Sequence, residues 1–399
     1  MTKKLYREDA YLFEFVSEVT SVVGTDAGYE VILEATAFYP EAGGQRCDLG
    51  RLNDHEVVDV FEDDRGRVVH RLKSWSGAAG ETVRGVIDRA RRLAHMRQHT
   101  GQHILSQAFL KVAGARTISS HLGEREATIE LSEASLDDDV IDRAERTANG
   151  IVLEDRPITT GEYERGELSR LPMRKVPDIP GPLRVVAVDG FDYTACGGTH
   201  CRRTGEVGPV KIIGREKIRG HLRVLFLTGH AAIEDYVEKH RVVAALMQKL
   251  TCHHLALESS LDKILEHNTE LKKEITTLVK RLLPTEVAAL KSKADEISGI
   301  GVSVAEYPGR DLKEMREIAL ELVSHPGHMA VLISGDRLLV AVSDGVKPDA
   351  RRLADAIMKN VGGKGGGSSV LAQVGAIAWE DRINPEEWIK DIVRSELSR

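Results

Sequence analysis

The sequence predicts an α+β protein built from four consecutive parts: a small β-barrel (residues 1–90), an α+β domain (91–230), a long helical or coiled-coil segment (231–284) and a C-terminal α/β domain (285–399). Three observations support this order. Alternating apolar and β-branched residues fill the first part, apolar residues three or four positions apart mark the third, and helical and strand patterns alternate in the fourth. A chain of 399 residues is too long for one ordinary core.

The composition, with 42% hydrophobic and 29% charged residues, is typical of a soluble globular protein. No apolar run approaches the thickness of a bilayer, and the first residues contain no apolar signal-peptide core, so we expect neither a membrane span nor secretion. Four scattered cysteines are too few for a disulfide scaffold and fit a reducing cytoplasm. The net charge of −7 argues against a strongly basic nucleic-acid coat but allows local basic patches.

The first part is predicted to consist mainly of strands. Residues 16–23 and 29–37 carry alternating apolar and β-branched residues. Residues 56–61 and 67–72 flank a turn at 63–66, whose Asp-Asp-Arg-Gly sequence is typical of a hairpin. Closing such strands into a small barrel satisfies their edges.

The second part mixes helices and strands without strict alternation, which indicates an α+β arrangement. A helix with a basic start is predicted over 88–112, and a second helix over 137–154. Residues 126–132 and 183–188 have strand patterns, and 172–182 is a proline-rich connection.

The third part contains a row of apolar residues that steps by three or four positions from Leu250 to Leu282. This row predicts a long amphipathic helix that begins near residue 231 and ends near Pro284, because proline disfavours helix continuation. Asn268 lies in the row, where a buried amide can fix the register of a coiled coil. A helix packed on its own chain fits the pattern equally well, and we predict a homodimer through the C-terminal half.

The fourth part is predicted to contain, in order, a helix (286–298), a strand (300–306), a helix (311–324), two strands (329–334 and 337–342) and a helix (348–360). A glycine-rich stretch, Gly362 to Ser369, follows. Backbone N–H groups of such a loop can approach a phosphate, and Lys364 adds positive charge. A flexible linker would have a similar composition.

Two short motifs carry the strongest chemical signal. His99 and His103 lie four residues apart on the predicted helix, so their side chains share one face. Cys196 and His200 flank a Gly-Gly-Thr turn, in which the glycines let thiolate and imidazole converge. Three imidazoles and one thiolate suit tetrahedral Zn²⁺ better than Mg²⁺ or Ca²⁺. Either pair alone is a common coincidence, but the two together predict a zinc site.

These motifs, His99-Thr-Gly-Gln-His103 and Cys196-Gly-Gly-Thr-His200, resemble those of the editing domain of alanyl-tRNA synthetases. The stretch from Phe38 to Gln45 looks like the glycine-rich motif of that domain, with Ala42 where a third glycine is usual. Gly362 to Ser369 is similar to a motif of the synthetase C-terminal domain. Since no aminoacylation domain precedes the barrel, the chain resembles the free-standing alanyl-tRNA editing proteins, the AlaX group, in their long form.

The resemblance implies a trans-editing hydrolase that deacylates mischarged tRNA-Ala, chiefly Ser-tRNA-Ala, with Gly-tRNA-Ala as an open second substrate. An aminoacyl ester is already reactive, so the enzyme needs positioning and a polarised water more than a strong nucleophile. Serine and alanine differ by one hydroxyl, which a hydrogen-bonding second site can recognise where an apolar pocket cannot.

The resemblance also implies roles for individual residues. Gln45 of the glycine-rich motif and Thr117 are the expected catalytic-site residues, Thr117 because its segment resembles the one that holds the serine-selecting threonine of short editing proteins. A strand threonine without a ligand role is the alternative. His121 is a further candidate for the pocket, and Asp192 could orient a ligand imidazole. The expected tRNA-binding residues in the C-terminal domain are Gly363, Lys364, Gly365 and Gly366.

Two other functions compete with editing. A tRNA-binding protein with a purely structural zinc is one, because four protein ligands leave no open coordination position. A phosphoesterase is the other, because a related terminal domain occurs in the DHH phosphoesterases. That group needs an Asp-His-His motif for two metals, and the nearest triplet here is Cys252-His253-His254.

Overall fold

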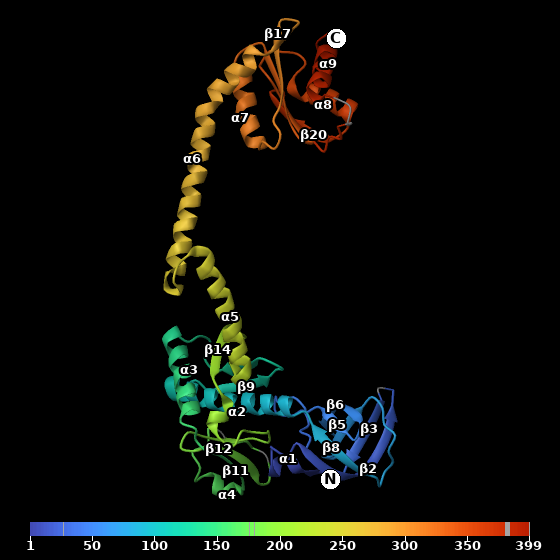
Figure 1. Cartoon of the computed structure of the whole chain (residues 1–399), viewed down its shortest axis with the longest axis vertical. Coiled ribbons are helices and arrows are strands. Elements are labelled where there is room, and N and C mark those ends of the chain that lie inside the picture. Colours follow the sequence, from blue (N-terminus) through green and yellow to red (C-terminus); the bar gives the residue numbers. More distant parts are fainter. Residues whose placement is uncertain (27, 175, 179, 380–383, 399) are drawn as a thin grey trace. The chain divides into compact units, whose positions relative to one another are not determined.

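A computed structural model describes the chain over residues 1–26, 28–174, 176–178, 180–379 and 384–398. The chain divides into two compact units, Met1–Lys249 and Leu250–Arg399, and each is described by itself. The expected α+β class is confirmed, with a closed six-stranded barrel and nine α-helices in the described part of the chain (Figure 1). Within those same residues, no helix combines the length and apolarity that crossing a bilayer requires.

The predicted barrel is present at the start of the first unit, in the strand order β2-β3-β7-β6-β5-β8. Its strands are β2 (Glu14–Thr25), β3 (Gly28–Leu33), β5 (Gly50–Leu52), β6 (His55–Glu62), β7 (Val68–Leu72) and β8 (Thr82–Ile87). The predicted hairpin turn joins β6 to β7, where Gly66 N donates to the carbonyl of Asp63. The single strand expected over 29–37 is wrong, because β3 ends at Leu33. A separate β4 (Ala35–Thr36) then pairs in parallel with β1 (Lys3–Lys4), just before the short α1 (Leu5–Glu8).

The central element of the first unit is α2 (Arg89–Ala113), which confirms the helix predicted over 88–112. Asp88 caps its first turn by accepting from the backbone N–H of Arg91, and Gly114 ends it with φ 68°. The continuous stretch from Gln98 to Phe109 is buried. A helix buried on this scale belongs to a core rather than a surface.

Two sheets and one helix surround this part of the first unit. The four-stranded sheet has the order β14-β15-β10-β9, and the three-stranded sheet has the order β11-β12-β13. These elements and their connections are β9 (Thr117–Leu122), β10 (Ala127–Leu131), α3 (Asp138–Leu153), β11 (Ile158–Tyr163), α4 (Arg165–Leu168), β12 (Leu183–Val188), β13 (Asp192–Ala195), β14 (Val210–Ile218) and β15 (His221–Thr228). The predictions over 126–132, 137–154 and 183–188 are confirmed by β10, α3 and β12.

A buried ion pair joins the barrel to α2. Arg92 and Asp48 are both fully buried, and Arg92 Nε lies 3.0 Å from each carboxylate oxygen of Asp48. The same guanidinium donates to the carbonyls of Ala10 (2.7 Å) and Ala37 (2.6 Å), and Tyr39 N donates to Asp48 Oδ2 (2.6 Å). The charges are therefore neutralised and hydrogen-bonded together, which is what makes their burial tolerable.

We expect Asp48→Asn to lower the free energy of unfolding by about 3–5 kcal/mol, because it leaves the Arg92 charge buried without a counter-charge. Chemical denaturation of the full chain measures this. Glu124→Gln removes the partner of an exposed pair with Arg46 and should cost no more than about 1 kcal/mol. Similar losses in the two variants would contradict the prediction.

The prediction of one continuous helix from residue 231 to Pro284 is wrong, because the region is divided between two helices and the second continues beyond Pro284. Two helices, α5 (Gly229–Leu250) and α6 (Leu257–Ser292), occupy the region, and the chain turns between them, with φ 50° at Thr251. Pro284 lies inside α6. The turns around it carry Leu283, Val287 and Leu290, which pack in the core of the second unit. This packing holds the helix together although proline removes one backbone hydrogen bond.

The second unit is built on a six-stranded sheet with the order β16-β17-β18-β19-β21-β20. Its elements are β16 (Asp295–Ile297), β17 (Ile300–Glu306), α7 (Leu312–Val323), β18 (His328–Ser334), β19 (Arg337–Val342), α8 (Ala350–Val361), β20 (Lys364–Gly367), β21 (Leu371–Gly375) and α9 (Pro385–Leu397). Alternate residues of β18 pack with α7 on one face of the sheet and with α8 and α9 on the other. The helix predicted over 286–298 is wrong, because its first half belongs to α6 and β16 follows.

The glycine-rich stretch predicted as a loop instead contains the edge strand β20, paired antiparallel with β21. A Cβ at Gly365 would lie 2.1 Å from the carbonyl oxygen of Gln373, and one at Gly367 would lie 2.2 Å from that of Leu371. Glycine is therefore required by the close approach of two backbones. The predicted tRNA-binding residues, Gly363 to Gly366, are exposed on this edge.

Candidate metal centre

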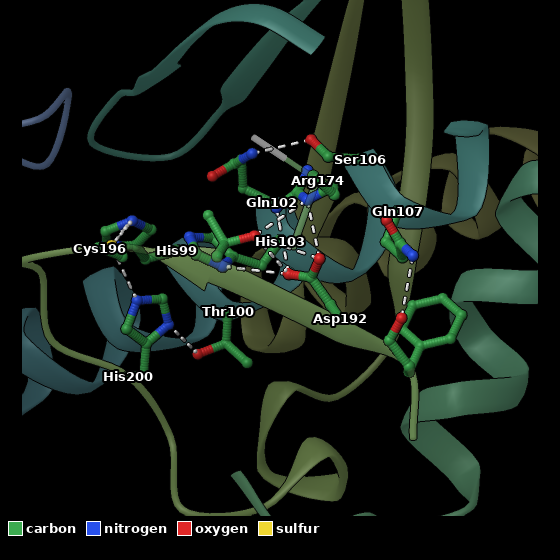
Figure 2. Close-up of polar contacts among 12 residues, drawn as sticks. His99, Thr100, Gln102, His103, Ser106, Gln107, Arg174, Asp192, Cys196 and His200 are labelled. Carbon is green, nitrogen blue, oxygen red and sulfur yellow. Dashed lines mark hydrogen bonds and ion pairs between the residues drawn. The ribbon is translucent and has the colours of Figure 1, made fainter. Parts of the chain in front are cut away.

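The structure brings the two predicted ligand pairs together. His99 and His103 come from α2, while Cys196 and His200 lie in the turn that follows β13. Cys196 Sγ lies 3.3 Å from Nε2 of both His99 and His200 (Figure 2). One ligand atom from each of the four residues lies within 4.8 Å of the others. Four buried or half-buried donors this close together could hold a metal ion.

Gln45 reaches this cluster from the barrel side. The chain reverses at Gly43–Gly44, with φ values of 59° and 83°, while the backbones of Ala42 and Gln45 hydrogen-bond in both directions. Positive φ at both central residues is the mark of a tight two-residue hairpin turn. Beyond it, Gln45 Oε1 lies 2.8 Å from His99 Nδ1 and accepts from Thr199 N (3.2 Å), and Gln45 Nε2 donates to Thr199 Oγ1 (2.8 Å). Gln45 therefore orients His99 from behind.

The other two imidazoles also have polar partners on their outer nitrogens. His200 Nδ1 lies 3.2 Å from Thr100 Oγ1, and His103 Nδ1 lies 3.5 Å from Asp192 Oδ2. Asp192 is itself held by Arg174, whose Nε lies 2.7 Å from Asp192 Oδ1. Outer partners of this kind hold a histidine with its inner nitrogen free for a metal. Asp192 thus lies beside the His103 ring, and its orienting role stays a prediction.

Burial and neighbouring charges set the protonation of the cluster. Burial by itself would raise the pKa of the Cys196 thiol, but the His99 and His200 rings hold that pKa well below its usual value. Burial lowers the pKa of His200 to about 3. His103 differs, because burial would lower its pKa but Asp192 and Cys196 together raise it. A thiolate is the form of Cys196 that a metal ion requires, and a cation would compete with the His103 proton.

Position 198, in the turn between Cys196 and His200, has room only for glycine. A Cβ there would lie 2.2 Å from His99 Cε1 and 2.4 Å from His99 Nδ1. Arg184 on β12 holds the same turn by donating to the carbonyls of Cys196 (2.8 Å) and Gly198 (3.0 Å). The backbone and the His99 ring are therefore packed in direct contact.

We expect Gly198→Ala to displace the His99 ring and to weaken metal binding by about 10–100-fold, the usual effect of disturbing a residue that orients a ligand. Competition with a chromophoric chelator measures the affinity. Gly197→Ala is the matched control, because a Cβ at Gly197 meets nothing within 4 Å. Equal metal affinities of the two variants would refute this account of Gly198.

A cavity of about 800 Å³ opens beside the cluster. Its wall includes His99, His103 and Cys196, and the serines and threonines that line it are Ser106, Thr117, Ser119, Ser120 and Thr194. The basic residues on its wall are Arg7, Arg116 and Arg174. The cavity therefore combines potential metal ligands, hydroxyl groups and positive charge.

The predicted site residues do not all lie in this cavity. Thr117 lines it, at the start of β9. Gln45 and Asp192 are buried behind the ligands, and the exposed His121 does not line the cavity.

Several residues of the site were not predicted. Arg174 and Arg184 lie outside any recognisable motif, and only the folded chain brings them to Asp192 and to the ligand turn. Ser106 had a signal that could have found it. It follows His103 by three positions on the same helix, so it shares the ligand-bearing side of α2.

Two family models match parts of this chain. Residues 183–223 match the threonyl and alanyl tRNA synthetase second additional domain, and residues 7–91 match the class II (A) tRNA synthetases. The alanyl-tRNA editing protein AlaX-L of Pyrococcus horikoshii is 29% identical over 94% of this chain and 94% of its own. The chain is a relative of the alanyl-tRNA editing proteins.

Longer relatives contain a similar sequence. The alanine–tRNA ligases of Pyrococcus abyssi and Archaeoglobus fulgidus are each 35% identical over 98% of this chain. The matched region is 43% and 44% of those ligases, so the chain spans less than half their length. Among solved structures, the C-Ala domain of Aquifex aeolicus alanyl-tRNA synthetase matches 27% of this chain and 98% of its own at 22% identity. Its TM-score of 0.24 is too low to support a statement about fold.

Proposed function

We propose that this chain hydrolyses the ester that joins a wrong amino acid, chiefly serine, to tRNA-Ala, at a zinc ion held by His99, His103, Cys196 and His200. One observation carries the proposal: three of the four potential metal ligands, His99, His103 and Cys196, form one wall of a cavity that also presents hydroxyl groups. The similarity to AlaX-L over nearly the whole of both chains supports alanyl-tRNA as the substrate. A cytoplasmic location follows from that function.

Zinc fits the donor set. Bonds of about 2.3 Å to sulfur and about 2.1 Å to nitrogen give a tetrahedron whose sulfur–nitrogen edges are about 3.6 Å. The 3.3 Å separations of Cys196 Sγ from His99 and His200 Nε2 need only a small expansion. When bound, zinc would supply a Lewis acid that polarises the ester carbonyl or a water.

The chain's own residues would bind and orient the ester. Thr117 faces the cavity and would hydrogen-bond the serine hydroxyl, while Gln45 holds the His99 ring in place from behind. Arg7 and Arg116 would contact phosphates at the 3′ end of the tRNA, since arginine suits phosphate in both charge and geometry. Because an aminoacyl ester is activated already, positioning supplies much of the required acceleration.

The second unit would add affinity for tRNA and for a second copy of the chain. Lys364 and the neighbouring glycines are exposed on the edge strand β20, where backbone groups and a positive charge can meet phosphates. The apolar row on α6 is exposed at Leu271, Ile275 and Leu282, by 43%, 57% and 62%. Covering such a row in a homodimer would remove it from water.

A tRNA-binding protein with a structural zinc is the second candidate. The specific observation in its favour is the ligand count, because four protein donors complete a tetrahedron without an open position. Retention of zinc without any deacylation would favour this function over editing.

We expect wild-type protein to hold one zinc per chain and to deacylate Ser-tRNA-Ala faster than Ala-tRNA-Ala. Cys196→Ala should lose both zinc and activity, because the thiolate is one of four ligands. Cys252→Ala, outside the cluster, should keep both. Metal analysis and deacylation rates measured on the same samples test this. Equal zinc contents in wild type and Cys196→Ala would refute the ligand set.

We expect Thr117→Val to reduce the preference for Ser-tRNA-Ala over Ala-tRNA-Ala by about tenfold, the effect of losing one neutral hydrogen bond. Valine keeps the shape of threonine and removes its hydroxyl, whereas Thr117→Ser keeps the hydroxyl and should retain most of the preference. The ratio of the two deacylation rates is the measurement. An unchanged ratio in Thr117→Val would show that Thr117 does not recognise serine.

A further inference from the structure

Thr117 does not stand alone in the cavity, because it belongs to a short hydrogen-bonded row with Ser106 and Gln102. Ser106 Oγ lies 2.8 Å from Thr117 Oγ1 and accepts from Gln102 Nε2, also at 2.8 Å. All three residues line the cavity, and Ser106 and Gln102 are themselves buried. Figure 2 shows the Gln102–Ser106 bond on the part of α2 that carries His103.

Counting protons shows what this row offers to a ligand. The Gln102 amide nitrogen can only donate, so it occupies one lone pair of Ser106. The Ser106 and Thr117 hydroxyls carry two protons between them, and the bond that joins them uses one. Across the described residues, neither hydroxyl donates to a backbone carbonyl, whereas Thr147 of α3 donates to Arg143 O. The two hydroxyls therefore keep one proton and at least one lone pair with which to bind a ligand in the cavity.

We propose that Ser106 is a second specificity-determining residue and that the Ser106–Thr117 pair binds the side-chain hydroxyl of the aminoacyl group as donor and acceptor at once. This rests on the proposed function and names the β-hydroxyl as the group of the substrate that the pair recognises. A seryl group satisfies both remaining positions. Glycyl and alanyl groups satisfy neither, so the pair favours a seryl ester over both.

Gln102 acts through Ser106 and is a positioning residue. Its amide occupies one lone pair of Ser106. It thereby sets the direction in which the Ser106 hydroxyl can still donate or accept a hydrogen bond. Since α2 also carries His99 and His103, the helix holds this row at a set distance from the potential metal ligands. The hydroxyl and the ester of one small aminoacyl group can then be held together.

The test compares deacylation of Ser-, Gly- and Ala-tRNA-Ala by full-length wild type, Ser106→Ala, Thr117→Val and the double variant. Wild type should prefer seryl over glycyl substrate. Ser106→Ala should lower the seryl rate about tenfold and change the glycyl rate by less than about twofold. Because the two hydroxyls act as a unit, the double variant should lose less than the product of the single losses.

Ser119→Ala is the matched control, because this cavity serine donates its hydroxyl proton outward to Glu130. It should keep the wild-type ratio of seryl to glycyl rates. Zinc content is measured on every sample, and if Ser106→Ala loses zinc, Ser106→Cys, a weaker donor and acceptor of similar size, should still lower the ratio.

Equal losses on seryl and glycyl substrates in a zinc-loaded Ser106 variant would overturn the inference and leave the proposed function intact. A zinc-loaded wild type that deacylates none of the three substrates would overturn both.

Discussion

The site depends on how the barrel is fixed to α2. Asp48 binds Arg92, and three residues earlier in the same segment Gln45 contacts His99. The two contacts lie seven residues apart on α2, about two helical turns. A slip of the barrel along the helix would separate a fully buried ion pair and would also withdraw Gln45 from the ligand ring. Burying charges contributes little net stability, but it penalises every docking position except the one that pairs them.

The same docking explains why the cluster is assembled from three distant segments. The barrel turn supplies Gln45, α2 supplies two histidines, and the turn after β13 supplies the thiolate and the third histidine. Glycines stand where these segments come closest, at Gly44 against the carbonyl of Ser120 and at Gly198 against the His99 ring. Side chains at either position would push the segments apart. The glycines of the two motifs therefore allow the segments to approach each other closely, in addition to allowing the chain to turn.

The sequence predicted those features that depend on residues close together in the chain. The capped α2 and the β6–β7 hairpin follow from spacing, caps and turn residues, and the four potential ligands follow from donor type. Pro284 was misread because packing of Leu283 and Val287, which no local rule contains, holds α6 together around it. The glycine-rich stretch was misread as a loop because its glycines serve the pairing of β20 with β21, and its partner strand was not recognised. Arg174 could not have been found, since only the tertiary fold places it on Asp192.

A single face of α2 links the potential metal ligands to the residues proposed to select the substrate. Taking 100° per residue, His99, Gln102, His103 and Ser106 fall within about 100° of one another around the helix axis. Ser106 follows His103 by three residues, about 4.5 Å along the axis. A buried helix cannot stretch, so this spacing is constant. The distance between a metal-bound ester and the hydroxyl pair would then be set by helix geometry, and only a side chain short enough to carry its hydroxyl on the β-carbon would meet both.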